Sequence, residues 1–208
     1  MKTILYIDAF NLYYGSLKGT PYKWLNPLAL ARLVLGASHD ITAVKYFTAK
    51  MLPRADNPGQ LTRQLFYLRA LQTLPNASIT YGRYLTHNVT MPLANPQPGG
   101  PRFVVVMKSE EKGSDVNLAS HMLLDAFDNA CDCAVLVSGD SDLCMPVEIL
   151  KNRFMKTVGV INPQHKVSRK LKESATFYKH IVESTLAASQ FPEQLRDAQG
   201  AFHKPAGW

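Results

Sequence analysis

One segment predicts the architecture of this chain: Ala134-Val135-Leu136-Val137-Ser138-Gly139-Asp140-Ser141-Asp142. Its near-continuous apolar run ends in a Ser-Gly turn, which is typical of a strand buried on both faces and hence of a parallel sheet. Two carboxylates, Asp140 and Asp142, follow at once. Open α/β sheets bind their ligands at the carboxyl ends of such strands. The segment therefore predicts both a fold class and the edge of the sheet where a site should lie.

The amino terminus repeats this arrangement. Thr3-Ile4-Leu5-Tyr6-Ile7 is apolar and strand-like, and Asp8 follows it directly. Because a carboxylate at the end of an apolar strand must be solvated, paired or bound to a metal, Asp8 is hard to explain as packing alone. Two strands that end in aspartate within one domain predict an acidic pocket, in which the carboxylates would repel each other unless a cation is bound.

Strand and helix patterns alternate along the rest of the chain. Strands are predicted at residues 3–8, 41–48, 78–84, 133–138 and 157–161, and helices at 27–35, 61–74, 115–129 and 142–152, with a basic helix beginning at 168. This alternation predicts βαβ units, and therefore an α/β, Rossmann-like fold of three layers around a central parallel sheet. In the helix at 115–129, the predicted buried face holds Val116, Ala119, Met122, Leu123, Ala126 and Phe127.

Two regions interrupt the alternation. Residues 86–101 contain four prolines and two glycines, so we predict a loop that acts as a flap over the site. Residues 103–107 are predicted to be a short edge strand or the return of that loop. The pattern is lost near the carboxyl terminus, so we expect a domain over residues 1–180 and a loosely structured tail over 181–208.

Composition narrows the function classes. The chain has 208 residues, a net charge of +7 and only three cysteines, an odd count that fits reduced thiols better than a disulfide framework. The positive charge favours polyanionic partners such as nucleic acid. No apolar run approaches the roughly 18 residues that span a bilayer, and the amino terminus has no signal-peptide pattern. We therefore expect a cytoplasmic protein with no membrane association.

The candidate site consists of carboxylates at predicted strand-to-helix junctions: Asp8, Asp115, Asp140 and Asp142. Oxygen ligands of this kind suit hard cations such as Mg²⁺ or Mn²⁺. Taken singly, Asp115 and Asp142 are more typical of helix caps, and only the joint occurrence of all four favours a metal site. Asn11 has two interpretations of equal weight, a polar partner of a phosphate or metal-bound water, or a cap of the next helix. The predicted substrate-contacting residues are Lys112, Ser138 and Ser141.

Three segments together resemble the motifs of the NYN-domain (LabA-like) family of the PIN-like nuclease superfamily: Tyr6-Ile7-Asp8-Ala9-Phe10-Asn11-Leu12, Lys112-Gly113-Ser114-Asp115-Val116 and Ser138-Gly139-Asp140-Ser141-Asp142. The resemblance covers residues 1–161 and extends to about Tyr178, and it implies a Rossmann-like sheet, a divalent-cation site and ribonuclease activity. It also implies that the four aspartates are the acidic residues, with Asn11 as their polar partner.

Three functional hypotheses follow. The first is a Mg²⁺- or Mn²⁺-dependent nuclease that prefers RNA over DNA, with basic residues along the nucleic-acid backbone: Lys108, Lys112, Lys151, Arg153, Lys166, Arg169, Lys170 and Lys172. The alternative is a catalytically silent module that binds RNA or protein. A metal-dependent phosphatase ranks last, because Phe10 stands where such enzymes use a second aspartate. Whether the chain forms a homo-oligomer stays open.

Overall fold

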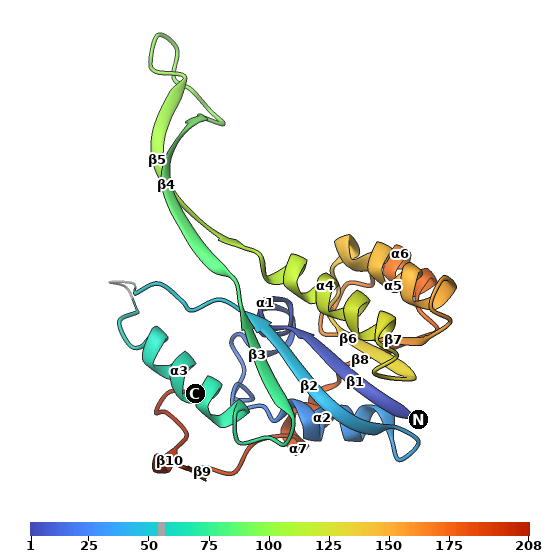
Figure 1. Ribbon diagram of the computed structural model, residues 1–208. Helices are drawn as coiled ribbons and strands as arrows, with labels where there is room; N and C mark the ends of the chain where they lie inside the picture. Colours follow the sequence, from blue (N-terminus) through green and yellow to red (C-terminus); the bar gives the residue numbers. More distant parts are fainter. Residues whose placement is uncertain (54–56) are drawn as a thin grey trace.

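A central six-stranded parallel sheet organises the computed structural model, which describes residues 1–53 and 57–208 (Figure 1). Every strand pair within it is parallel, which confirms the predicted α/β, Rossmann-like fold class. In spatial order the strands are β3 (Ala77–Tyr81), β2 (Asp40–Thr48), β1 (Lys2–Asp8), β6 (Cys133–Val137), β7 (Thr157–Asn162) and β8 (Phe177–His180).

The strand order reverses between β1 and β6. From β1 the chain moves through β2 to β3 at one edge, and it then returns to β6 on the other side of β1 before it continues to β7 and β8. Ile7 pairs with Val137 in the register of these two central strands, so their carboxyl ends lie side by side. Doubly wound sheets bind ligands at such a topological switch point. Asp8 and the segment from Ser138 to Asp142 therefore meet there.

Helices cover both faces of the sheet. One face packs α2 (Pro27–Leu35) and α3 (Gln60–Leu71), and the other packs α4 (Ser114–Phe127), α5 (Cys144–Asn152) and α6 (Arg169–Ser174). Successive residues of β1 point to opposite faces, with Leu5 in the first core and Tyr6 in the second. The remaining helical segments are α1 (Ala9–Leu12), a π-helix η1 (Tyr13–Leu17), a 3-10 turn η2 (Ser141–Leu143) and α7 (Glu183–Ala188).

The predicted loop at 86–101 is wrong. β4 (Arg83–Pro92) and β5 (Phe103–Lys112) pair antiparallel over their whole length, and Figure 1 shows them as an arm that projects from the sheet. Only residues 93–102 connect the two strands, and the Leu93 amide donates to the Arg102 carbonyl at the start of the tip. The prolines lie within this tip or at its edges, where a strand ladder does not need their missing N–H groups.

The buried face of α4 agrees with the predicted one only in part. Met122 and Ala126 are buried as predicted, but Val116 and Phe127 are 69% and 75% exposed, and Leu118, which was not predicted, is fully buried. The α4 sequence carries apolar residues on two neighbouring stripes, so its periodicity alone does not identify the stripe that faces the core.

The expected loose tail is also wrong. Residues 181–208 contain α7, β9 (Gln194–Asp197) and β10 (Gly200–His203). Arg69 of α3 donates from Nε and Nη2 to the two Asp197 carboxylate oxygens, both at 2.7 Å, and its guanidinium lies 4.1 Å from the centre of the buried Phe202 ring. The tail is therefore fixed to the core by a few long-range contacts. The three cysteines are unpaired and buried, and none of the helices in the described ranges is long and apolar enough to span a bilayer.

Candidate functional site

An acidic pocket lies at the switch point. It forms where the carboxyl ends of β1 and β6 meet the start of α4 and the base of the β4–β5 arm, and it is lined by Asp8, Phe10, Asn11, Tyr14, Tyr84, Glu111, Ser114, Asp115, Asp140 and Gln164. Four of these side chains are carboxylates, and none is a lysine or an arginine. The structure thus brings together Asp8, Asp115 and Asp140, and it adds Glu111, which the sequence did not indicate.

Asp8 is the buried centre of this pocket. Its side chain accepts from two donors, the backbone N–H of Asn11 at 2.9 Å from Oδ1 and the Ser138 hydroxyl at 3.0 Å from Oδ2. Burial raises the pKa of Asp8 to about 6, the two hydrogen bonds act against this, and the charges of Asp115 and Asp140 raise it further. A carboxylate in this position is costly to ionise, and a bound cation would offset that cost.

Asn11 joins the two strand ends. Its Oδ1 accepts from the Gly139 amide at 2.9 Å and from Gln164 Nε2 at 3.1 Å. Asn11 lies inside α1, so the interpretation that it caps the next helix is wrong. Gly139 is required here, because a Cβ would lie 2.4 Å from Asn162 Oδ1 and 2.9 Å from Gln164 Cγ.

Ser138 positions the carboxylates. It is fully buried, and its hydroxyl donates to Asp8 and accepts from the Asp140 backbone amide at 3.1 Å. Ser138 therefore does not have the substrate contact that was predicted for it. Ser141 is exposed and lies in a neighbouring hollow with Asp140, Gln164 and Lys166.

Asp140 and Asp142 have different surroundings. Asp140 lines the pocket, and its Oδ1 accepts from the Asp142 amide at 3.0 Å. The Asp142 side chain is exposed and outside the pocket lining, although its charge still contributes to the raised pKa of Asp115. Burial is the largest cause of that shift, followed by the charges of Asp140 and Glu111.

The base of the arm supplies the far wall. Glu111 of β5 is paired across the ladder with Tyr84 of β4, and both side chains line the pocket. The Glu111 carboxylate accepts from the Ser114 amide at 3.1 Å and from the Ser114 hydroxyl at 2.7 Å, which fixes it at the start of α4. Lys112 is the next residue, so it points to the other face of the ribbon and pairs with Glu110 at 3.2 Å. The prediction that Lys112 contacts the substrate is therefore not met by this arrangement.

The donor set fits a hard cation. All the charged groups of the pocket are carboxylates, which Mg²⁺ and Mn²⁺ prefer over imidazole or thiolate. Within residues 1–53 and 57–208, no three His, Cys, Asp or Glu side chains form a group that could enclose a metal ion as they stand. Mg²⁺ keeps several waters and is commonly held by one or two carboxylates together with substrate phosphates, so it does not need such a cage.

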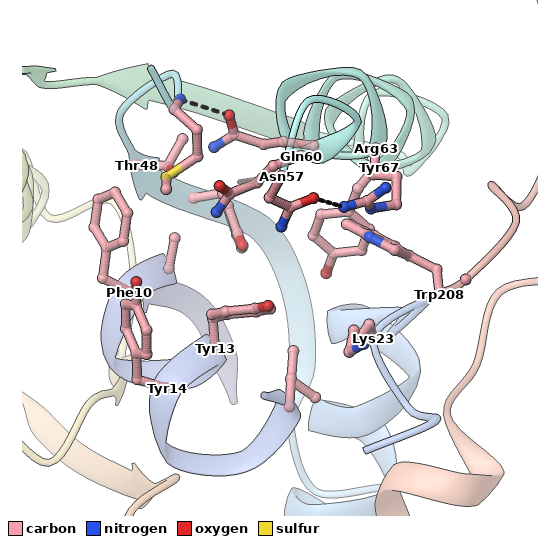
Figure 2. A pocket seen from close by; sticks show the side chains of 16 residues that line it. Phe10, Tyr13, Tyr14, Lys23, Thr48, Asn57, Gln60, Arg63, Tyr67 and Trp208 are labelled. Atoms are coloured by element: carbon pink, nitrogen blue, oxygen red, sulfur yellow. Dashed lines mark hydrogen bonds between the residues drawn. The ribbon is translucent and has the colours of Figure 1, made fainter. Parts of the chain in front are cut away.

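A second cavity of about 170 Å³ adjoins the acidic pocket. Six aromatic side chains line it, and two of them, Phe10 and Tyr14, belong to both cavities. Figure 2 shows side chains from several elements around it, among them Tyr13, Lys23, Asn57, Arg63, Tyr67 and Trp208. Its described lining holds two cationic residues, Lys23 and Arg63, and no acidic residue. The charged side chains that the structure describes therefore have opposite signs in the two neighbouring cavities.

Comparison with known proteins gives matches of three kinds, to a family model, to a curated protein and to a solved structure. The NYN domain model matches residues 2–183. The 6-hydroxy-3-succinoylpyridine 3-monooxygenase HspA of Pseudomonas putida (strain DSM 28022 / S16) is 29% identical over an alignment of 236 positions, which covers 100% of this chain and 75% of that protein. The crystal structure of a protein of unknown function from Vibrio parahaemolyticus RIMD 2210633 superposes with a TM-score of 0.54 at 19% identity, over 88% of this chain and 93% of that one. This last likeness shows a shared fold.

Proposed function

This chain belongs to the NYN-domain family, and from that membership we propose that it is a divalent-metal-dependent ribonuclease. The observation that carries the proposal is the acidic pocket, in which Asp8, Asp115, Asp140 and Glu111 gather at the switch point of a nuclease-like fold. A chain with a net charge of +7 has no evident use for clustered carboxylates unless a cation offsets them, because they weaken binding of a polyanion.

The residues of the pocket divide into two tasks. One or two of Asp8, Asp115 and Asp140, together with water and substrate phosphate oxygens, would hold Mg²⁺ or Mn²⁺, which when bound polarises a phosphate and lowers the pKa of a water ligand. Ser138 and the Asn11 amide keep the Asp8 carboxylate oriented toward the pocket through their hydrogen bonds. Asp142, which was also predicted as a ligand, would act from the rim through its charge.

Basic side chains near the pocket would hold the nucleic-acid backbone. Lys166 lies beside Asp140 and Ser141, next to the start of the basic helix α6. A phosphate seated over the carboxylates would therefore have a cation within reach on the β7 side. RNA is the proposed substrate in preference to DNA, as the family resemblance implies.

The test is cleavage of labelled RNA, DNA and a small phosphomonoester, each with Mg²⁺, Mn²⁺ or excess EDTA. The proposal expects metal-dependent cleavage of RNA and little turnover of the phosphomonoester. Tight RNA binding without cleavage in any metal would instead identify the silent binding module. Phosphomonoester turnover alone would identify a phosphatase.

A second candidate function is oxygenation of a small heteroaromatic compound. The Pseudomonas relative is named as a monooxygenase of 6-hydroxy-3-succinoylpyridine, and the observation that favours this candidate is the aromatic cavity beside the acidic pocket. Oxygenation would place one oxygen atom of O₂ on the ring and reduce the other to water with two electrons and two protons. It predicts O₂ consumption that requires both that pyridine and an electron donor such as a reduced nicotinamide. O₂ consumption that does not change when the pyridine is added would exclude it.

A further inference from the structure

We propose that the aromatic cavity is a binding site for one heteroaromatic ring that carries an anionic group. The ring can belong to a nucleotide or to a free heteroaromatic acid, because the cavity would recognise the chemistry that the two share. Binding of the ring requires neither a metal nor cleavage of RNA, so the inference does not depend on the proposed nuclease activity.

The size of the cavity matches a single ring. A cavity of about 150 Å³ is large enough to bind benzene. The cavity described here measures about 170 Å³, so it admits one six-membered ring with small substituents. On one side the cavity borders the acidic pocket, where Phe10 and Tyr14 line both cavities.

The aromatic walls are already in place. Tyr67 is 5% exposed, and its hydroxyl donates to the Leu25 carbonyl at 2.9 Å, so its ring cannot turn freely. The centre of the Trp208 ring lies 5.2 Å from that of Tyr67 and 6.1 Å from that of the buried Trp24, so Trp208 packs against two fixed rings. Tyr13 stands on the opposite side, on η1 (Figure 2). Rigid aromatic walls bind planar rings well because little conformational entropy is lost on binding.

The charge of the cavity favours an anionic ligand. Arg63 of α3 reaches the cavity from one side, and one of its terminal nitrogens donates to Asn57 Oδ1. Arginine has five N–H donors, so the guanidinium retains donors for a carboxylate or phosphate. Tyr13 and Arg63 line the same cavity, and the Arg63 charge acts against the rise that burial causes in the pKa of Tyr13. Lys23 adds a second cation to the lining.

The experiment measures binding of two matched pairs of probes by calorimetry in excess EDTA and without RNA. Uridine 5′-monophosphate is compared with uridine, and pyridine-3-carboxylate with pyridine-3-carboxamide. We expect at least one anionic probe to bind more tightly than its neutral partner. Binding of the nucleotide alone identifies a nucleobase subsite, and binding of the carboxylate alone identifies a site for a free acid.

Two variants test whether the binding is in this cavity. Arg63→Gln should weaken binding of the anionic probe by about 10- to 100-fold, the range for a hydrogen bond to a charged group, and leave the affinity for the neutral probe unchanged. Trp208→Ala should weaken binding of both members of a pair, and Arg102→Gln, a matched change at the exposed tip of the β4–β5 arm, should change the binding of neither. Thermal melting checks that each variant is folded. The inference is overturned if no probe binds at millimolar concentration, or if Arg63→Gln and Trp208→Ala bind like the wild type. Because RNA cleavage is measured separately, either result leaves the nuclease proposal to its own test.

Discussion

Replacing Asp8 by asparagine should stabilise the metal-free protein at neutral pH. In the folded chain the pKa of Asp8 is about 6, against an ordinary value of 3.8, chiefly because the carboxyl is buried. A group whose pKa is raised by folding contributes stability that is present below pH 3.8 and lost as the pH rises through about 6. Above that pH the folded protein therefore carries the full cost of a buried charge.

The cost can be worked out from the shift. At about 1.36 kcal/mol for each pKa unit, ionising Asp8 in the folded state costs about 3 kcal/mol. Asparagine avoids this cost, but its amide cannot accept from both the Asn11 amide and the Ser138 hydroxyl as the carboxylate does. Losing one such hydrogen bond costs about 1 kcal/mol, which leaves a net gain of about 2 kcal/mol for Asp8→Asn.

The assay is urea unfolding of both proteins in EDTA between pH 4 and pH 8. The variant should be more stable at pH 8, and its advantage should vanish near pH 4. In saturating Mg²⁺ the wild type should instead be more stable than Asp8→Asn, because a ligand at 100 times its Kd stabilises the folded wild type by about 2.7 kcal/mol. Asp142→Asn is the matched control, and its exposed side chain should change stability by less than about 0.5 kcal/mol. The reasoning is refuted if Asp8→Asn is the less stable protein at pH 8 in EDTA.

Three further predictions concern the rest of the fold. Phe202→Ala should lower the free energy of unfolding by about 3 kcal/mol, since the ring is 3% exposed; an unchanged urea midpoint would mean that the tail is not part of the core. Gly139→Ala should lower the free energy of unfolding in urea by about 1–3 kcal/mol and reduce RNA cleavage, because the new methyl group must displace Asn162 and Gln164, and Gln164 donates to Asn11. Cleavage at the wild-type rate by this variant would show that the packing around Gly139 does not shape the pocket. Replacing residues 94–101 of the arm tip with a two-residue Asn-Gly turn should leave the melting temperature unchanged, and a large decrease would show that the tip packs as structure.

The sheet and most of the carboxylate site could be predicted from local sequence. Buried parallel strands read as continuous apolar runs, so β1 and β6 were identifiable, and the aspartates that follow them were assigned correctly to one edge. Asn11 and Ser138 were correctly expected near the site. Their tasks were not, because hydrogen bonds across strands that are more than a hundred residues apart leave no local pattern.

The β4–β5 arm was missed because its prolines and glycines dominated the interpretation of residues 86–101. A two-stranded ribbon exposed on both faces shows no clean alternation of apolar and polar residues, so the usual strand signal is weak. Glu111 lies on β5, so it was not predicted as a residue of the site either. Had β5 been recognised up to Lys112, its alternation would have placed Glu111 and Lys112 on opposite faces.

The tail was missed for a different reason. Its few apolar residues, such as Leu195 and Phe202, are too sparse to show a period, and its order depends on partners in α3. Contacts of Arg69 with Asp197 and of Tyr67 with Trp208 join residues more than a hundred positions apart. A local sequence pattern does not reveal such pairs.

The most direct test of the central claim is the single-turnover rate of RNA cleavage by the wild type and by Asp140→Asn, with Mg²⁺ and with excess EDTA. Asp140 lines the acidic pocket, and the substitution keeps the size of the side chain while it removes the charge that would hold the cation. The account predicts cleavage by the wild type in Mg²⁺, none in EDTA, and a rate for Asp140→Asn at least about a hundredfold lower. Lys112→Gln, a matched loss of charge outside the pocket, should cleave at nearly the wild-type rate. Cleavage that persists in EDTA, or an Asp140→Asn rate equal to the wild type, would contradict the account.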